Sequence, residues 1–560
     1  MRVKRVSLLL HTARARGRGV GLCLLCLSVL LVACGAPAAP APTNAPQGAV
    51  VPGPTAGKGP VQPKVFRFAS QVDLLALDPA VGHDGATALM QKNVYNALVR
   101  HLGNPPKVVP ELAESSTVSP DATLWTFVLK KNAKFHDGTP VTSAAVKFSF
   151  DRLLRIKKGV YWMFSDITDS SSMTTPDDYT VKVQLKKPFA PFADAMTWLF
   201  ILNPQQVKAH DTGDDGQGWL KDHDAGSGPF TVKSWNSGDS YQFDAVADYW
   251  GGWRPEGRLS GILWRIVREP STRKQLLEKG EVDAIDYPTP DDIQLLSQNP
   301  DIVVPATGGI GVYNIKLNNK HGFTADIHVR KAISYAFDYD ALIKVMGGRA
   351  TLQEGPLSVN SPWAAKGLPI YRMDLNKAKA ELAQSQWPNG GIELTFAYVQ
   401  GLEEERLTGE IMLSQLSKLG IKVSITPLLW SDAVAKFQKQ DTSPDMFPVY
   451  SGTDYPDADN FLWQAYHSSQ AGFWAAASWY QNPAFDKLLE DARATTDSQK
   501  RADLYKQAQQ LLLQDAAEVF GMSTLGGLLR RAWVKGYEYS PVMGSPGYRD
   551  LYIDGRPDTQ

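Results

Sequence analysis

The chain has 560 residues, of which 43% are hydrophobic and 21% charged, and its 58 basic residues balance 58 acidic ones. This composition is typical of a soluble globular protein, and the length predicts two or more lobes. Residues 1–34 contain six basic and no acidic residues, which leaves 52 basic (58 − 6) against 58 acidic residues in the remainder. A mildly acidic remainder without a basic stripe argues against nucleic-acid binding.

The N-terminus has the pattern of an export signal. A basic stretch leads into an apolar run at 20–33, which is shorter than the roughly 20 residues that span a bilayer. The run ends in LVACG (31–35), which resembles the bacterial lipoprotein cleavage box. The resemblance implies a signal peptide at 1–34 and a lipid on Cys34 that anchors the protein to a membrane. The alternative is an ordinary signal peptide that happens to contain a cysteine.

The other two cysteines carry no predicted function. Cys23 and Cys26 form a C-x-x-C, a spacing that can indicate redox or zinc chemistry. Both lie inside the segment that the signal interpretation removes. We therefore expect no disulfide and no metal site from cysteine in the mature protein.

Beyond the signal, composition and periodicity outline the folded part. Residues 35–63 are nearly all Ala, Pro, Gly and Thr, which predicts a disordered tether, with folded sequence starting near Lys64. Strands are expected at 65–69, 124–129 and 421–425. Amphipathic helices are expected around 146–153, 329–337, 412–419 and 504–512, with Thr142 as the cap of the first. Helices and strands interleave, so the predicted class is α/β or mixed α+β.

Short motifs recur along the chain in a fixed order. They are LDP (77–79), VYNAL (94–98), PELAE (110–114), WTF (125–127), FHDG (135–138), GSGPF (226–230), YWGG (249–252), VRKAI (329–333) and DYPD (454–457). In this order they resemble the extracytoplasmic solute-binding proteins of peptide-type ABC importers, the oligopeptide- and dipeptide-binding family. The resemblance extends from about Phe66 to the C-terminus.

That family implies a layout and a function. Its fold is α/β, a two-lobed periplasmic-binding-protein-like (type II) fold with an extra subdomain and a two-segment hinge. Lobe I would comprise 64–88, 205–311 and 529–560, the extra subdomain 89–204, and lobe II 312–528. The implied function is capture of extracellular peptides between the lobes and delivery to ABC permease subunits in the membrane. We expect a monomer without a cofactor or metal.

The resemblance also places a binding site in the second lobe. A peptide enclosed in a cleft takes its ammonium group out of water, which is costly unless a carboxylate meets it. Family members use the Asp that begins the D-x-x-(D/E) stretch, matched here by Asp454. The backbone of Tyr450, Gly452 and Thr453 would then pair with the peptide as an added strand.

The facing lobe would contribute His83 and Gly85, which match the family's segment on the other side of the peptide. Two departures from the family pattern bear on the ligand. Ser451 stands where relatives commonly have Trp, and Ala458 replaces a second Pro. The alternative role for Asp454 is a turn residue that caps the loop through Pro456.

Two other functions stay open at this stage. Aromatic residues gather at 461–480, and Trp463, Trp474 and Trp479 could stack on sugar rings, which makes oligosaccharide binding the alternative ligand class. Packing in the core is the other explanation for this cluster. A secreted hydrolase is the minor alternative, because the nine histidines show no catalytic spacing and no G-x-S-x-G elbow occurs. We therefore assign no catalytic residue and expect no enzyme.

Overall fold

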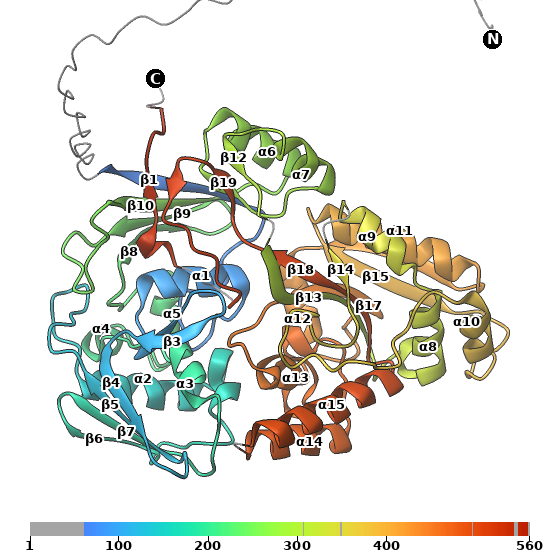
Figure 1. Ribbon diagram of the computed structural model, residues 1–560, viewed down its shortest axis with the longest axis horizontal. Helices are drawn as coiled ribbons and strands as arrows, with labels where there is room; N and C mark the ends of the chain where they lie inside the picture. The colour runs from blue at the N-terminus through green and yellow to red at the C-terminus, as the bar shows by residue number, and fades with distance from the viewer. Residues whose placement is uncertain (1–60, 306, 348–349, 496, 543–546, 558–560) are drawn as a thin grey trace, which may run out of the picture. The chain divides into compact units, whose positions relative to one another are not determined.

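Two mixed β-sheets organise this computed structural model, which describes residues 61–557 except 306, 348–349, 496 and 543–546 (Figure 1). The predicted signal peptide, the lipidation site Cys34 and residues 35–60 of the predicted tether lie outside the described residues. The first strand begins at Val61, three residues before the expected start at Lys64, because its backbone already pairs with Gly257.

Sheet A has seven strands, built from three separate parts of the chain. In spatial order they are β12 (Ile302–Val303), β19 (Leu529–Arg531), β11 (Ala284–Ile285), β1 (Val61–Ser70), β10 (Gly257–Ile266), β9 (Ser240–Ala245) and β8 (Phe230–Asn236). β1 pairs in parallel with β10 and β11, and the remaining pairs are antiparallel. The side chains of Phe66 and Phe68 on β1 are buried, with half-exposed Arg67 between them, as the period of two in a strand requires.

Sheet B has six strands, all from residues 307–526. In order they are β14 (Thr351–Leu352), β18 (Glu518–Gly526), β13 (Thr307–Leu317), β17 (Met446–Ser451), β15 (Glu393–Val399) and β16 (Lys422–Leu428). β13 lies antiparallel to β18 and β17, while β15 is parallel to β17 and β16. β13 starts at Thr307, five residues before the expected lobe boundary at 312.

A smaller sheet, sheet C, and two ribbons complete the strands. Sheet C runs β4 (Ala113–Val118), β5 (Leu124–Leu129), β7 (Thr180–Gln184) and β6 (Met173–Asp177). The ribbons are β2 (Val99–Leu102) with β3 (Lys107–Pro110), and β20 (Val534–Lys535) with β21 (Tyr552–Ile553). Sheet C is made wholly from the range expected for an extra subdomain.

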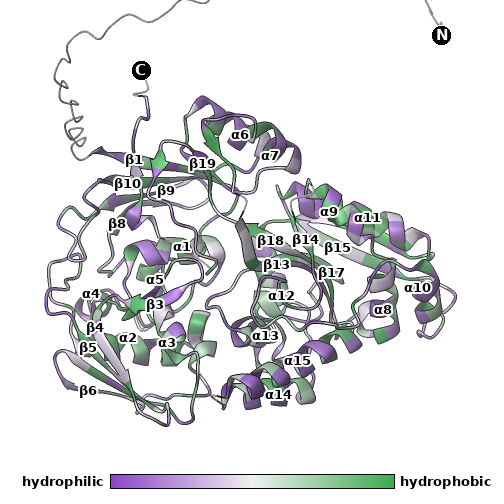
Figure 2. Ribbon diagram, viewed as in Figure 1, coloured by the Kyte–Doolittle hydropathy of each residue, from purple (hydrophilic) through white to green (hydrophobic). Residues whose placement is uncertain are grey.

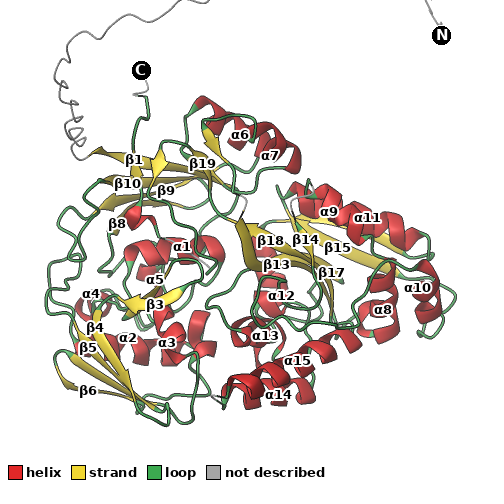
Figure 3. Ribbon diagram, in the orientation of Figure 1, coloured by secondary structure: helices red, strands yellow, loops and turns green. Residues whose placement is uncertain are grey.

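Helices alternate with the strands along the chain (Figure 3). Up to β10 they are α1 (Gly85–Val94), α2 (Ser143–Ile156), α3 (Phe192–Ala195), α4 (Pro204–Ala209) and α5 (Gln217–Leu220). The later ones are α6 (Pro270–Lys279), α7 (Pro290–Leu296), α8 (Ile327–Ala336), α9 (Tyr339–Val345), α10 (Leu375–Leu382), α11 (Glu403–Ser417), α12 (Trp430–Phe437), α13 (Ala458–Tyr466), α14 (Pro483–Arg493) and α15 (Ser498–Gln514). None of these described helices combines the length and hydropathy that crossing a membrane requires.

The predicted amphipathic helices and strands are confirmed. The expected strand at 124–129 is β5, and Thr142 is the N-cap residue of α2, although its side chain makes no capping hydrogen bond. The expected faces of α2 and α8 are buried. Hydrophilic and hydrophobic residues alternate along α14 and α15, as expected for helices with one buried face (Figure 2).

Two connections join sheet A to sheet B: the segment between β12 and β13, and the segment between β18 and β19. The GSGPF motif leads into β8 of sheet A and packs against the end of α1. A Cβ atom on Gly226 would lie 2.1 Å from the carbonyl oxygen of Val94, and one on Gly228 would lie 2.5 Å from the same residue's carbonyl carbon. The motif therefore requires glycine because two backbones touch there.

Candidate functional site

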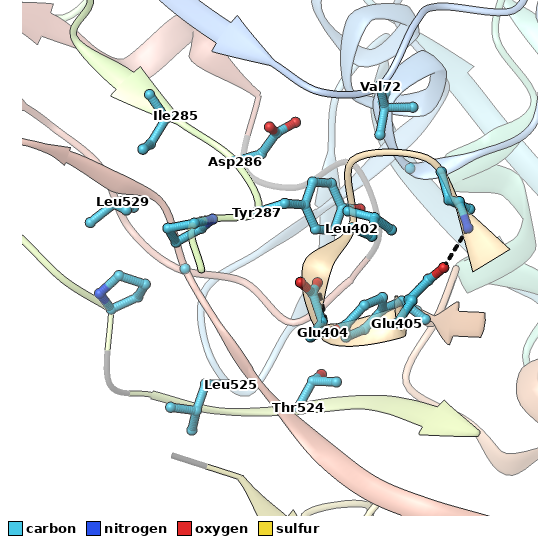
Figure 4. Close-up of a pocket in the computed structure, with 18 of the residues that line it drawn as sticks. Val72, Ile285, Asp286, Tyr287, Leu402, Glu404, Glu405, Thr524, Leu525 and Leu529 are labelled. Carbon is cyan, nitrogen blue, oxygen red and sulfur yellow. Dashed lines mark hydrogen bonds between the residues drawn. The ribbon is translucent and has the colours of Figure 1, made fainter. Parts of the chain in front are cut away.

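A cavity of about 570 Å³ lies between sheet A and sheet B. Sheet A contributes Phe68, Trp264 and the segment that leaves β11, while sheet B contributes the ends of β15, β17 and β18. Figure 4 shows Asp286 and Tyr287 on one segment facing the turn that carries Leu402, Glu404 and Glu405. The volume of the cavity is within the range that is typical of ligand-binding sites.

Most of the cavity wall is apolar. Six aromatic side chains contribute to it: Phe68, Trp264, Tyr287, Trp430, Tyr450 and Trp474. Aliphatic residues such as Leu402 and Met522 fill the spaces between them. Such a wall favours ligands with a large hydrophobic surface, while the few polar groups fix orientation.

The charged groups on the wall are all acidic. Asp84, Asp286, Glu404 and Glu405 line the cavity, and the described lining residues include no Lys, Arg or His. Asp84 caps α1, accepting hydrogen bonds from the backbone N–H groups of Ala86 and Thr87. Asp286 accepts hydrogen bonds from the Ser70 hydroxyl and the Gln71 N–H. Burial raises the pKa of both aspartates, more than their hydrogen bonds lower it.

Glu404 and Glu405 stand in the first turn of α11, where the helix dipole favours negative charge. The Tyr450 hydroxyl donates to Glu404 Oε1 at 3.1 Å, and the Val399 N–H donates to Glu405 Oε2 at 2.8 Å. Burial raises the pKa of Glu404 to about 7, and it raises that of Glu405 well above its usual range. Burial therefore favours the protonated form of both carboxyl groups.

Tyr287 has an unusual backbone at this site. Its φ of 39° is in the left-handed region, which a bulky residue adopts only when its surroundings impose it. Burial and the charges of Asp286, Glu404, Glu405 and Asp84 all raise the pKa of its hydroxyl. The four carboxyl groups therefore act on one point of the cavity.

Among the residues that the sequence predicted as ligand contacts, Gly85, Tyr450, Gly452 and Trp474 line the cavity. Thr453, His83 and Asp454 do not line it. The backbone of Thr453 pairs with Val542 of the C-terminal segment instead.

Asp454 is 1% exposed, and its carboxylate is fully used within the protein. Oδ1 lies 3.0 Å from His83 Nε2, and Oδ2 accepts hydrogen bonds from Asn460 and Gln464. The Trp198 indole donates to the Asp454 carbonyl at 2.8 Å. A ligand ammonium at Asp454, as the sequence predicts, would have to replace one of these partners.

The Trp474 indole extends the same network by donating to the His83 carbonyl at 3.0 Å. Trp463 and Trp479 lie away from the cavity wall. Trp463 stacks on His467 and on the guanidinium of Arg493, and the Trp479 indole donates to the Phe437 carbonyl. Of the three predicted stacking residues, the structure brings Trp474 to the cavity.

Sequence reasoning missed the four carboxyl groups of the cavity. The only local signal for Glu404 and Glu405 is the EEE run (403–405) after Gly401, which also fits an exposed acidic first turn. Asp84 looks like an ordinary N-cap, and Asp286 follows a strand of two residues. Among the described residues, no three His, Cys, Asp or Glu side chains form a candidate metal site.

Comparisons with known proteins identify the family. The model for bacterial extracellular solute-binding proteins, family 5 middle, matches residues 107–473. The probable D,D-dipeptide-binding periplasmic protein DdpA of Escherichia coli K12 is 32% identical over 84% of this chain and 90% of its own length. Heme-binding protein A of Haemophilus influenzae is 29% identical over 88% of this chain and 92% of its own length.

Solved structures agree with this family. DppA from Helicobacter pylori, in complex with the peptide STSA, matches with a TM-score of 0.80 and 26% identity, covering 87% of this chain and 98% of that one. AgaA of A. tumefaciens R10, in complex with agropinic acid, matches with a TM-score of 0.78 and 26% identity. This match covers 88% of this chain and 99% of the AgaA chain. The two-lobed α/β fold predicted from the sequence is confirmed. The chain belongs to the bacterial extracellular solute-binding proteins of family 5.

Proposed function

We propose that this protein captures peptides outside the cell and delivers them to the permease subunits of an ABC importer. The observation that carries the proposal is the cavity of about 570 Å³ between sheets A and B, in a chain of this family. DdpA is named as a D,D-dipeptide-binding protein, and the DppA structure holds the peptide STSA. The protein acts by binding without turnover, as a monomer.

The proposed mechanism is closure of two lobes on the ligand. We assign lobe I to 64–88, 205–311 and 529–560, the extra subdomain to 89–204 and lobe II to 312–528. The connections at β12–β13 and β18–β19 would be the hinge. Gly85 on one side, and Tyr450 and Gly452 on the other, would contact the peptide backbone. Contact between His83 and Asp454 would hold the lobes together once closed.

The anchor is part of the proposal. We infer that Cys34 carries the lipid that holds the protein at the outer face of a membrane. Cys34→Ser should move the protein from the membrane fraction to the soluble fraction. A variant that stays with the membrane would contradict the anchor and leave the binding function untouched.

Native mass spectrometry of the processed protein, purified from its own cells, tests the ligand class. We expect a set of adducts that fragment as short peptides. A ladder of sugar masses would instead move the assignment to oligosaccharides, which the aromatic wall around Trp474 could also stack against. Hydrolysis of the captured peptide by purified protein would contradict the proposal of binding without turnover.

A further inference from the structure

The acidic groups of the cavity wall have no basic counterpart among the described residues that line it. Four carboxyl groups line it, two from the side of sheet A (Asp84 and Asp286) and two from the start of α11 (Glu404 and Glu405). Arg273 does not line the cavity, but its charge acts on Asp286 and Glu404. Its guanidinium donates to the carbonyls of Val267, Arg268, Asp286 and Tyr287, and its Nε lies 3.7 Å from Asp286 Oδ1. Arg273 thus acts on Asp286 and on Glu404 from behind the wall, and none of the four carboxyl groups has a cationic partner in the part of the wall that the structure describes.

One of these groups has an unused acceptor. Asp84 is 4% exposed, and its Oδ1 accepts the two capping hydrogen bonds. Its Oδ2 is buried and has no partner with hydrogen-bond geometry among the described residues, although the nearby Thr87 side chain lowers the pKa of this carboxyl against the larger effect of burial. A buried carboxylate oxygen without a donor is costly, so its position on a cavity wall indicates a donor supplied from outside the chain.

The carboxyl groups line the cavity but do not form a metal site within the part of the chain that the structure describes. All four act on the hydroxyl of Tyr287, yet no three of them form a candidate metal site among the described residues. A cation with several N–H donors spread over a larger radius fits this arrangement. Ammonium and guanidinium groups have that geometry, and the apolar wall fits hydrocarbon attached to them.

We propose that the ligand of this cavity is an organic cation: an ammonium or guanidinium group on an apolar body, held between Asp84 and Glu404, with no carboxylate bound in the cavity. The proposal rests on the proposed function in taking this cavity as the ligand site, and it narrows the peptide to one with its α-ammonium or a basic side chain inside. A carboxylate there would meet carboxyl groups on both sides, and it would meet like charge wherever these are ionised. The carboxyl terminus of such a peptide therefore points out of the cavity.

The test uses the full processed protein, freed of bound ligand by unfolding and refolding, and native mass spectrometry with an equimolar pool. The pool contains tripeptide amides with a free α-ammonium, the same peptides acetylated, and acetylated peptides with Lys, norleucine or Glu at one position. Phenethylamine is added as a cation that is not a peptide. We expect the cationic peptides to be retained at least tenfold more than their neutral and acidic counterparts.

Variants locate the cation. Asp84→Asn keeps the helix cap, and Glu404→Gln keeps the acceptor for Tyr450, so both should fold. Each variant should retain the cationic peptides less than threefold more than their neutral and acidic counterparts. Glu410→Gln makes the same charge change on the outward side of α11, where the side chain is 53% exposed, and should keep the preference. Asp454→Asn is the direct comparison, because the sequence places the ammonium there.

Each outcome decides a different point. Equal retention of neutral or acidic peptides overturns the inference and leaves peptide capture standing. A preference lost with Asp454→Asn, but kept with Asp84→Asn and Glu404→Gln, also overturns it. Retention of phenethylamine without any peptide supports the cation and overturns peptide capture. If the protein retains nothing from the pool, both proposals fail.

Discussion

Glu404→Gln should stabilise the ligand-free protein at alkaline pH. Burial raises the pKa of Glu404 in the folded protein from 4.5 to about 7. Between those two pH values the folded state holds a proton that the unfolded state has released, so the free energy of unfolding falls as pH rises. With 1.36 kcal/mol per pKa unit, a pKa difference of about 2.5 (7 − 4.5) costs the wild type about 3 kcal/mol above pH 7. Glutamine fills the same space, accepts from Tyr450 and never ionises.

The assay is urea unfolding of ligand-free wild type and variant at pH 5 and pH 8, followed by circular dichroism and tryptophan fluorescence together. The variant should be more stable by about 1 kcal/mol at pH 5 and about 3 kcal/mol at pH 8, since the loss starts at the unfolded pKa. Titrating groups that do not interact with Glu404 cancel in the difference. Glu405 does not cancel, because the charge of Glu404 raises its pKa, and its release from that charge adds to the stability of the variant in the same direction. Glu410→Gln should show less than about 1 kcal/mol at both pH values, as an exposed pair with Arg406 contributes little.

A difference that does not grow with pH would refute the reasoning, because it would mean that Glu404 ionises as easily in the folded protein as in the unfolded one. A variant less stable than wild type at pH 8 would refute it as well. In that case the carboxylate would be stabilised by Arg273 and Tyr450 beyond the cost of burial. The cavity would then need no cation from a ligand.

Three further predictions concern the same network and its surroundings. Affinity for a cationic peptide should rise between pH 6 and pH 8, by up to about tenfold, as Glu404 with its pKa of about 7 ionises, while a norleucine counterpart measured by calorimetry should show no rise. His83→Asn should cost about 1–3 kcal/mol, because Asp454 Oδ1 loses its partner at 3.0 Å; an unchanged melting temperature would contradict this. Arg493→Met should cost about 3–5 kcal/mol in urea unfolding, because it leaves the buried Asp459 carboxylate unpaired. Adding Asp459→Asn to that variant should recover part of the loss, and no recovery would argue that packing under Trp463 is what matters.

Elements of the fold that depend on local pattern were predictable from the sequence. The face of α8 follows a period of 3.6 residues, and β5 is a run of aromatic and β-branched residues, so neighbours in the sequence fix both. The sheets depend on distant partners. β19 has three residues and lies between β12 and β11, which are about 227 and 244 residues away by residue number (529 − 302 and 529 − 285). Nothing within such a strand specifies those neighbours. The family resemblance supplied only the assignment of 529–560 to the same lobe as 205–311.

The site was predicted in part for the same reason. Gly85, Tyr450 and Gly452 came from the resemblance and Trp474 came from the aromatic cluster at 461–480, and all four line the cavity. Glu404 was missed because helix position alone does not say which of three adjacent glutamates faces inward. The inward position of Glu404 becomes evident only from its contacts with Tyr450 of β17 and from the influence of Arg273 of α6 on its pKa. The acidic character of a cavity is a tertiary property. It depends on which acidic side chains line the wall and equally on whether basic side chains line it, and both depend on how distant segments pack together.

The distribution of the carboxyl groups bears on how binding and closure are coupled. Asp84 and Asp286 belong to the side of sheet A, and Glu404 and Glu405 belong to the side of sheet B. In the proposed closure, the two pairs of carboxyl groups would approach one another in a poorly solvated space. Without a cation this would raise their pKa values and disfavour the closed form. A cation bound between the two pairs of carboxyl groups would remove this cost, but only when the sheet A side and the sheet B side both contact it. The contact between His83 and Asp454 joins the same two sides in this structure. The ligand therefore acts on the balance of charge in the cavity, and a protein with Glu404→Gln and Asp84→Asn together should close without a cation to drive it.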